Sequence, residues 1–372
     1  MHELGYGDIK AAVDRIAGQV RPVAIAPVVL GAGGEEARAG SQGSQGSLGS
    51  EGIQGSRGSQ GSRRSRGSRE GESGQGAGGG GREGQQIYLA LEFMQHTGSF
   101  KARGAANFLQ AHHEAGTLPD TGVTIASGGN AGLACAWAAR RRGVPATVFL
   151  PTTAPEVKVA KLRSYGADVR LAGAEYAEAL AACEEFAASS GALTSHAYDH
   201  PLIAAGAGTL LEEIRARIPG LDTVIVSVGG GGLFAGIATA ARHHGIRTVA
   251  VEPQNCRALD AALEAGDLVD VPVDSVAADS LGARRATSLA LHAARHESVR
   301  SVLVPDDAII RARQFLWDHH KLAVEHAAAT AFSVLTSRSG DGYRPGAGEK
   351  TAVVLCGANT DPSDLVGQPR NG

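Results

Sequence analysis

The residues with the clearest potential for chemistry lie around Lys101. This lysine stands in the segment Gly98-Ser99-Phe100-Lys101-Ala102-Arg103-Gly104, where a loop gives way to a helical pattern. Glycines allow a backbone to approach a ligand closely, and the N-terminus of a helix offers free N–H groups to a phosphate. A lysine in such a place can lose its proton by desolvation and form a Schiff base. This segment alone leaves open the alternative of an ordinary solvated lysine.

A second segment, Gly229-Gly230-Gly231-Gly232, has the pattern of a phosphate-binding turn. It follows an apolar run, Val224 to Val228, and precedes a helical pattern that starts at Leu233. Backbone N–H groups gathered at such a turn form a concave nest that suits a phosphate, and larger side chains would block the approach. A merely tight connection rarely needs four consecutive glycines, so we expect phosphate binding here.

The same turn permits a different cofactor. Gly230, Gly232 and Ala235 satisfy the spacing G-x-G-x-x-A, and Glu252 lies at the end of the next apolar run. Together these residues form the fingerprint of dinucleotide binding, with its ribose-binding acid. A dinucleotide-dependent oxidoreductase is therefore an alternative from another enzyme class, although it gives no reason for the segment around Lys101.

Two further segments place polar groups after apolar runs. Ser127-Gly128-Gly129-Asn130 can present backbone donors to an anion, although a helix N-cap is the simpler interpretation of the segment alone. Cys356-Gly357-Ala358-Asn359 follows the run Thr351 to Leu355, where a cysteine is most often a small buried apolar residue. Because ligands bind at the carboxyl ends of strands in open parallel sheets, we expect these segments to lie near the glycine turn.

Taken in order, the four segments resemble the pyridoxal-phosphate enzymes of the tryptophan-synthase-β class, in the serine/threonine dehydratase branch. The similarity covers roughly residues 87–366 and also touches the first helix. It implies the fold type II architecture, an α/β fold with two open twisted parallel-sheet domains. Pyridoxal 5'-phosphate would lie in the cleft between the two domains.

The resemblance also assigns roles around the cofactor. Lys101 is the catalytic residue that holds the cofactor and then removes the α-proton, and Phe100 belongs to the cofactor site. Gly229, Gly230, Gly231 and Gly232, with the amide of Leu233, hold the phosphate.

Asn130 bonds the ring hydroxyl oxygen of the cofactor, and Ser127, Gly128 and Gly129 join it in binding the substrate carboxylate. The Cys356 thiol faces the pyridine nitrogen. Glu325 matches a cofactor-site glutamate of the family, although His326 replaces the usual proline and a helix-start carboxylate is an equal alternative.

A cation site is a weaker implication of the same resemblance. Glu252, with the carbonyls of Cys256 and Ala258, resembles such a site. A divalent ion would want an acid where Ala258 stands, so a monovalent cation is the expected occupant.

Two features of these segments, a departure at Gly128 and the thiol of Cys356, favour dehydration. Relatives that racemise serine carry a serine as the second-face acid/base where this chain has Gly128. The neutral Cys356 thiol also holds a ring proton poorly, which elimination tolerates better than racemisation does. We therefore expect an L-serine/L-threonine ammonia-lyase that releases a 2-oxo acid and ammonia by eliminating the β-hydroxyl. A serine racemase or a 3-hydroxyaspartate dehydratase on the same scaffold is the nearest alternative.

Apolar runs that alternate with alanine-rich helical stretches must position these groups. This alternation predicts parallel sheets covered by helices on both faces. We expect an N-terminal helix and strand of the large domain at 1–33, followed by a low-complexity insert at 34–86. The large cofactor-binding domain continues at 87–94 and 198–372, and the small domain spans 95–197.

The insert is composed almost entirely of Gly, Ser, Gln, Arg and Glu. Its glycine period could suggest collagen, but without proline a triple helix has little to stabilise it, so a flexible polar linker is expected.

The run Arg21 to Pro27 before the insert departs from the R-T-P stretch usual in the family, which could impair local packing. We expect no C-terminal regulatory domain after Asn359, because the chain ends soon afterwards.

Bulk composition narrows the expected partners. A net charge of −3 gives no general electrostatic reason to bind nucleic acid or an anionic membrane, and no apolar run approaches a membrane span. Four scattered cysteines form no metal or disulfide pattern, which indicates a reducing cytoplasmic location. We expect a small hydroxy-amino-acid substrate and a homodimer or higher homo-oligomer.

Overall fold

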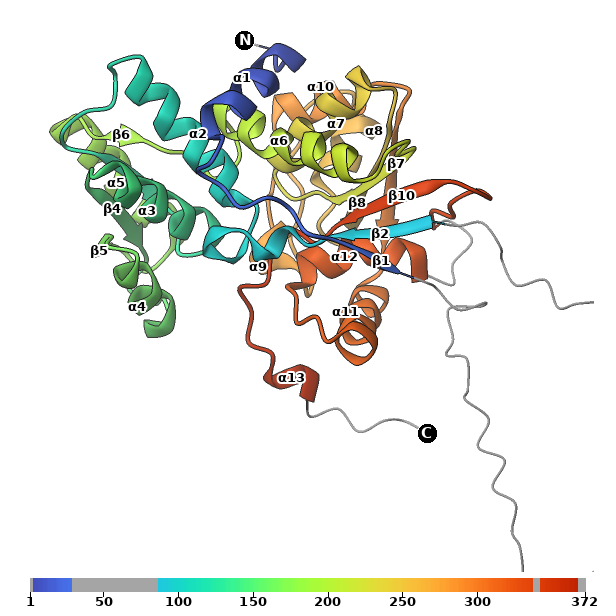
Figure 1. Ribbon diagram of the computed structural model, residues 1–372. Helices are drawn as coiled ribbons and strands as arrows, with labels where there is room; N and C mark the ends of the chain where they lie inside the picture. The colour runs from blue at the N-terminus through green and yellow to red at the C-terminus, as the bar shows by residue number, and fades with distance from the viewer. Residues whose placement is uncertain (1–2, 29–85, 337–341, 367–372) are drawn as a thin grey trace, which may run out of the picture. The chain divides into compact units, whose positions relative to one another are not determined.

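The computed structural model describes residues 3–28, 86–336 and 342–366. The insert expected at 34–86 lies outside these residues except for Gln86, which is the first residue of a strand. Figure 1 shows the chain folded around two β-sheets, with helices packed on their faces. The α/β class expected from the sequence is confirmed.

The larger sheet has the strand order β1-β2-β10-β7-β8-β9. Its strands are β1 (Ile25–Val28), β2 (Gln86–Ala90), β10 (Lys350–Val354), β7 (Thr223–Ser227), β8 (Arg247–Pro253) and β9 (Val299–Val304). All neighbours are parallel except β1 and β2, which pair antiparallel with Val28 opposite Ile87. The sheet is therefore parallel with one antiparallel edge strand.

The smaller sheet is entirely parallel, in the order β5-β4-β3-β6. Its strands are β5 (Asp168–Leu171), β4 (Ala146–Leu150), β3 (Val123–Ala126) and β6 (Leu193–Thr194). β3 and β4 are buried throughout, as expected for strands covered on both faces, whereas the edge strand β5 is largely exposed.

Helices connect the parallel strands and cover both sheets. They are α1 (Tyr6–Ile16), α2 (Lys101–Glu114), α3 (Asn130–Arg142), α4 (Glu156–Ser164), α5 (Tyr176–Ser190), α6 (Pro201–Arg217), α7 (Gly232–His243), α8 (Ala258–Ala265), α9 (Ala278–Leu281), α10 (Ser288–Ala294), α11 (Asp306–His320), α12 (His326–Thr336) and α13 (Ser363–Val366). Two short 3₁₀ turns, Glu92–Met94 and His96–Gly98, precede α2.

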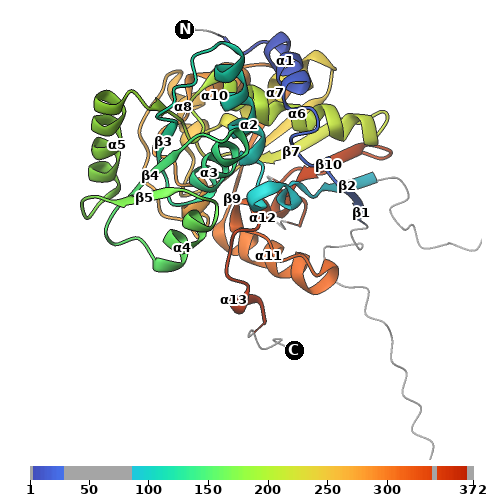
Figure 2. The same ribbon diagram turned by 60° about the vertical axis from the view of Figure 1, so that its left-hand side comes forward.

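Helices lie on both faces of each sheet. In Figure 1, α6, α7 and α10 lie above the larger sheet and α11 and α12 below it, and α12 contacts all of β7, β8, β9 and β10. In Figure 2, α3 and α5 lie on opposite sides of the smaller sheet. No helix of the described residues is long and apolar enough to cross a membrane.

The sequence pattern predicts a helix over Thr209–Arg217, but helix α6 begins about two turns earlier, at Pro201. The sequence misleads here because Gly206 and Gly208 weaken a helical pattern. The structure explains both glycines by close helix packing. A Cβ on Gly206 would lie 2.6 Å from the Arg103 carbonyl oxygen, and one on Gly208 would lie 2.7 Å from the Gly236 carbonyl oxygen.

Candidate active site

Two of the predicted segments, far apart in the chain, pair with each other at the start of α2. The Phe100 N–H donates to the Cys356 carbonyl and the Ala358 N–H to the Gly98 carbonyl, both at 3.0 Å. Between them, Ser99 and Gly357 form an antiparallel bridge. The backbone of the Cys356 segment therefore fixes the turn from which Lys101 projects.

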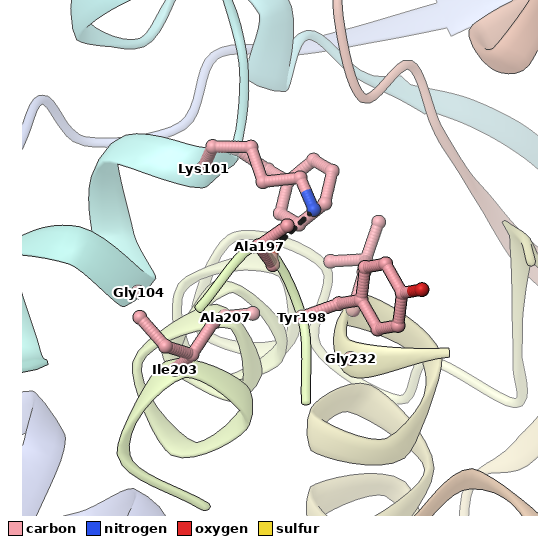
Figure 3. Close-up of a pocket in the computed structure, with 9 residues that line it drawn as sticks. Lys101, Gly104, Ala197, Tyr198, Ile203, Ala207 and Gly232 are labelled. Carbon is pink, nitrogen blue, oxygen red and sulfur yellow. Dashed lines mark hydrogen bonds between the residues drawn. The ribbon is translucent and has the colours of Figure 1, made fainter. Parts of the chain in front are cut away.

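Lys101 is the first residue of α2, and its amine points into the protein. The Nζ donates to the Ala197 carbonyl at 2.7 Å and lies 4.8 Å from the centre of the Phe100 ring (Figure 3). Burial lowers the pKa of this amine to about 8, against the opposing effects of Cys356 and Glu325. The amine is thus available in its neutral, nucleophilic form at mildly alkaline pH.

Cys356 follows β10 and is buried beside the end of β7. Its Sγ lies 3.7 Å from the Ser227 hydroxyl, and burial raises the pKa of the thiol to about 12. The group is therefore a neutral thiol near neutral pH. Ser227 was not among the predicted site residues, although a hydroxyl residue near the end of an apolar run just before the glycine turn is a visible signal.

Glu325 lies at the centre of a hydrogen-bond network. Its carboxylate accepts both contacts of the Asn130 Nδ2, at 2.9 and 3.0 Å, and the Asn359 N–H at 2.8 Å. The Ser280 hydroxyl donates to it at 3.0 Å. A Cβ on Gly357 would lie 2.9 Å from both carboxylate oxygens, which explains the glycine after Cys356. Glu325 thereby joins the Asn130 and Cys356 segments.

The segment Ser127–Asn130 forms the partly exposed turn between β3 and α3. Among the described residues, no hydrogen bond uses the N–H of Gly128, Gly129 or Asn130. A Cβ on Gly128 would lie 2.7 Å from Leu150 Cδ2, so that leucine fills the space that a side chain would take. The turn presents backbone donors suited to an anion.

The glycine turn leads from β7 into α7. Gly231 has φ +97°, a backbone conformation that favours glycine, and it precedes the first turn of the helix. Within the described chain, the N–H groups of Gly229, Gly230, Gly232 and Leu233 donate no hydrogen bond. These free donors at a helix N-terminus match the expected phosphate nest.

Contacts with Tyr198 are a second reason why Gly230 and Gly232 carry no side chain, and Tyr198 was not predicted from the sequence. A Cβ on Gly230 would lie 2.2 Å from the Tyr198 ring, and one on Gly232 would lie 2.7 Å from the Tyr198 carbonyl oxygen. Tyr198 also lines, with Phe100 and Lys101, a cavity of about 10 Å³ that reaches Gly232 (Figure 3).

Glu252 stands apart from these groups. Its two carboxylate oxygens accept the Leu259 and Asp260 N–H groups at 2.8 Å each, so that it caps α8. Burial raises the pKa of this carboxyl to about 8 despite the two amide donors. Both oxygens are thus engaged within the protein, and no group of three or more His, Cys, Asp or Glu in the described chain has the arrangement of a metal site.

The remaining groups fit pyridoxal phosphate. A buried amine stands beside free amides at a helix N-terminus, and a neutral thiol lies nearby. The Ser99 hydroxyl is fully buried and has no hydrogen-bond partner among the described residues. Lys101 would hold the aldehyde carbon of the cofactor, and the glycine turn would hold its phosphate.

Comparison with known proteins agrees with this chemistry. Residues 78–357 match the family described as pyridoxal-phosphate dependent enzyme. An L-threonine ammonia-lyase of Geobacter sulfurreducens is 37% identical over 280 residues, which cover 75% of this chain and 68% of that protein. A serine dehydratase-like protein of Homo sapiens is 33% identical over 287 residues, which cover 74% of this chain and 86% of that protein.

Among solved structures, a pyridoxal 5'-phosphate-dependent aspartate racemase is similar with a TM-score of 0.76 and 27% sequence identity. The match covers 98% of this chain and 99% of that one. It extends the likeness from sequence to architecture and supports the fold type II arrangement. The chain belongs to the pyridoxal-phosphate-dependent enzymes, in the serine/threonine dehydratase family.

Proposed function

We propose that this protein is a pyridoxal-phosphate-dependent ammonia-lyase that converts L-serine or L-threonine to a 2-oxo acid and ammonia. The observation that carries the proposal is the Lys101 amine, which is directed into the protein beside the neutral Cys356 thiol and the free amides of the glycine turn. The names of the relatives that share most of the chain point to the same activity.

Each group has a proposed task. When bound, pyridoxal phosphate withdraws electrons from the α-carbon of the amino acid attached to it. Lys101 Nζ would hold the cofactor and, once free, would take the α-proton of the substrate, with the Ala197 carbonyl orienting the amine. The amides of Gly229–Gly232 and Leu233 hold the phosphate, and Phe100 lies beside the ring.

The substrate side is proposed to lie at the turn after β3. The free amides of Gly128–Asn130, with Ser127, would bind the carboxylate. The Asn130 Nδ2, which donates to Glu325, would have to turn a proton toward the ring hydroxyl oxygen to bond it. Because Gly128 has no side chain and Leu150 fills the adjoining space, no acid/base at this position can protonate the second face of the α-carbon. This favours elimination over racemisation.

The cavity beside Lys101 is lined by Phe100 and Tyr198 and reaches Gly232, so the proposed cofactor site overlaps it. Tyr198, whose ring lies over Gly230, is the side chain best placed to make room.

We also propose the expected division into a large and a small domain, because all strands of the smaller sheet fall within 95–197 and β7 to β10 fall within 198–372.

A homo-oligomer remains part of the proposal and is tested by light scattering. The four cysteines are free and buried, which supports a reducing cytoplasmic location. A monovalent cation at Glu252 would have to use oxygens already bound to helix amides.

The test is the substitution Lys101→Ala, with Lys10→Ala on the exposed face of α1 as the control. We expect wild type and Lys10→Ala to show the absorbance of lysine-bound cofactor and to release 2-oxo acid from L-serine and L-threonine. Lys101→Ala should lose both. Release of the D-isomer in place of the oxo acid would indicate a racemase, and NAD binding without cofactor absorbance would refute the proposal.

A further inference from the structure

Asn359 makes an unusually complete set of contacts at the edge of the site. Its Nδ2 donates to the Thr97 carbonyl at 2.7 Å and to the Asn130 Oδ1 at 2.6 Å. Its Oδ1 accepts from Lys161 Nζ of α4 at 2.6 Å, and its backbone N–H donates to Glu325. Both amide protons of one side chain are therefore used on two other segments of the site.

The first of these segments is the turn that leads to Lys101. Thr97 has φ +63°, which is strained for a β-branched residue, and the following Gly98 also has a positive φ. A Cβ on Gly98 would lie 2.7 Å from Asn359 Oδ1, so the Asn359 side chain lies directly against this backbone. Strained backbone persists only where its surroundings hold it, and here the Asn359 amide holds the Thr97 carbonyl.

The second segment is the turn that carries Asn130. The Asn130 side chain is held from both ends, because Asn359 donates to its Oδ1 and its Nδ2 donates to Glu325. With one end fixed by Asn359, the other can point in only one direction. Asn359 thus joins the loop before Lys101 to the side chain proposed to contact the cofactor ring.

We propose that Asn359 is a positioning residue whose side-chain amide fixes the Lys101 amine and the Asn130 amide relative to each other. The inference rests on the roles proposed for Lys101 and Asn130. A displacement of about 1 Å in a catalytic arrangement can reduce the rate about 100-fold, so loss of these two hydrogen bonds should reduce kcat more than it changes KM.

The experiment compares Asn359→Ala, Asn359→Asp, Asn130→Ala and the double alanine variant. Asn359→Asp preserves the side-chain volume and the contact with Lys161 but removes both N–H donors. It therefore tests the proposal even if Asn359→Ala fails to fold. Asn255→Ala is the control, because Asn255 is exposed and its side chain makes no hydrogen bond among the described residues. Two measurements are made: kcat and KM of the holoenzyme, and the pH dependence with which an amine reagent labels Lys101 in the cofactor-free protein.

We expect both Asn359 variants to lower kcat about 100-fold with KM changed less than about threefold. The double variant should lose less than the product of the two single losses, because the residues act through one contact. Labelling of Lys101 should shift to higher pH as the amine becomes solvated. Wild-type-like kcat and labelling in Asn359→Asp would overturn the inference. A wild type without oxo-acid release would refute the proposed function instead, while Lys101 labelling would still report on Asn359.

Discussion

At the scale of single residues, the site depends on burial acting in opposite directions on two groups. Desolvation disfavours the charged form of any group, so it lowers the pKa of the Lys101 amine to about 8 and raises that of the Cys356 thiol to about 12. Both groups are consequently neutral at mildly alkaline pH. A neutral amine can attack a carbonyl carbon, and a neutral thiol in the proposed place of Cys356 would leave the cofactor nitrogen without a countercharge.

The low pKa of Lys101 should be visible in the titration of its amine in the cofactor-free protein. Because its pKa is lowered, the neutral amine should predominate above about pH 8, whereas a solvated lysine needs a pH above about 10.4. The rate at which an acylating reagent modifies Lys101, followed by peptide mass, should therefore rise with a midpoint near pH 8. A midpoint at or above about pH 10.4 would show that Lys101 is solvated.

At the scale of elements, α2 is anchored by a buried charge cluster at Arg103, two residues after Lys101 at the start of the helix. Arg103 is fully buried and donates from Nε to Glu92 at 2.7 Å and from Nη1 to Glu213 at 2.6 Å. Glu92 belongs to the 3₁₀ turn before α2, and Glu213 to α6. The cluster thus ties the helix that begins at Lys101 to two neighbours.

Removing one partner of a buried ion pair leaves the other charges unpaired. Arg103→Met should accordingly lower the free energy of unfolding by about 3–5 kcal/mol, as measured by urea denaturation. Arg163→Met removes an exposed pair with Glu156 and should change stability by less than about 1 kcal/mol. Equal effects of the two substitutions would mean that the buried cluster does not anchor α2.

The glycine turn between β7 and α7 supplies the next prediction. Gly231 has φ +97°, and a Cβ there would lie 2.3 Å from the Ala290 Cβ. Gly231→Ala should therefore destabilise the protein by about 1–3 kcal/mol and weaken the binding of pyridoxal phosphate. Gly245→Ala is the matched control, because Gly245 has φ +67° but open space around it. If both variants bind the cofactor as wild type does, the turn does not hold the phosphate.

At the scale of the whole molecule, the site forms where segments distant in the chain meet. β1 ends at Val28 opposite Ile87 of β2, so the two ends of the segment between them are already adjacent in the sheet.

Deleting residues 40–80 should therefore leave kcat unchanged within about twofold, and shortening the connection should stabilise the fold by roughly 1 kcal/mol through loop entropy. Turnover of L-serine and thermal unfolding of the deletion variant provide the measurement. Lost activity with intact folding would assign the segment a functional role beyond that of a spacer.

Local pattern predicted most of the elements, for reasons that the structure makes plain. Strands buried on both faces appear as continuous apolar runs, so β3, β4, β7 and β10 were predictable within a residue or two. β9 and the first turns of α6 were missed, because a partly exposed edge strand and a glycine-containing helix lack those signals.

The sequence by itself determined which residue types carry the chemistry: the lysine, the glycine turn and the polar ends of the apolar runs. Only the tertiary structure decided how they are held. It placed Tyr198 over the glycines, used Glu252 as a helix cap, and made Asn359 the link between Thr97 and Asn130. Residue spacing encodes burial and backbone preference along one element, whereas these contacts join segments whose approach depends on the packing of both sheets.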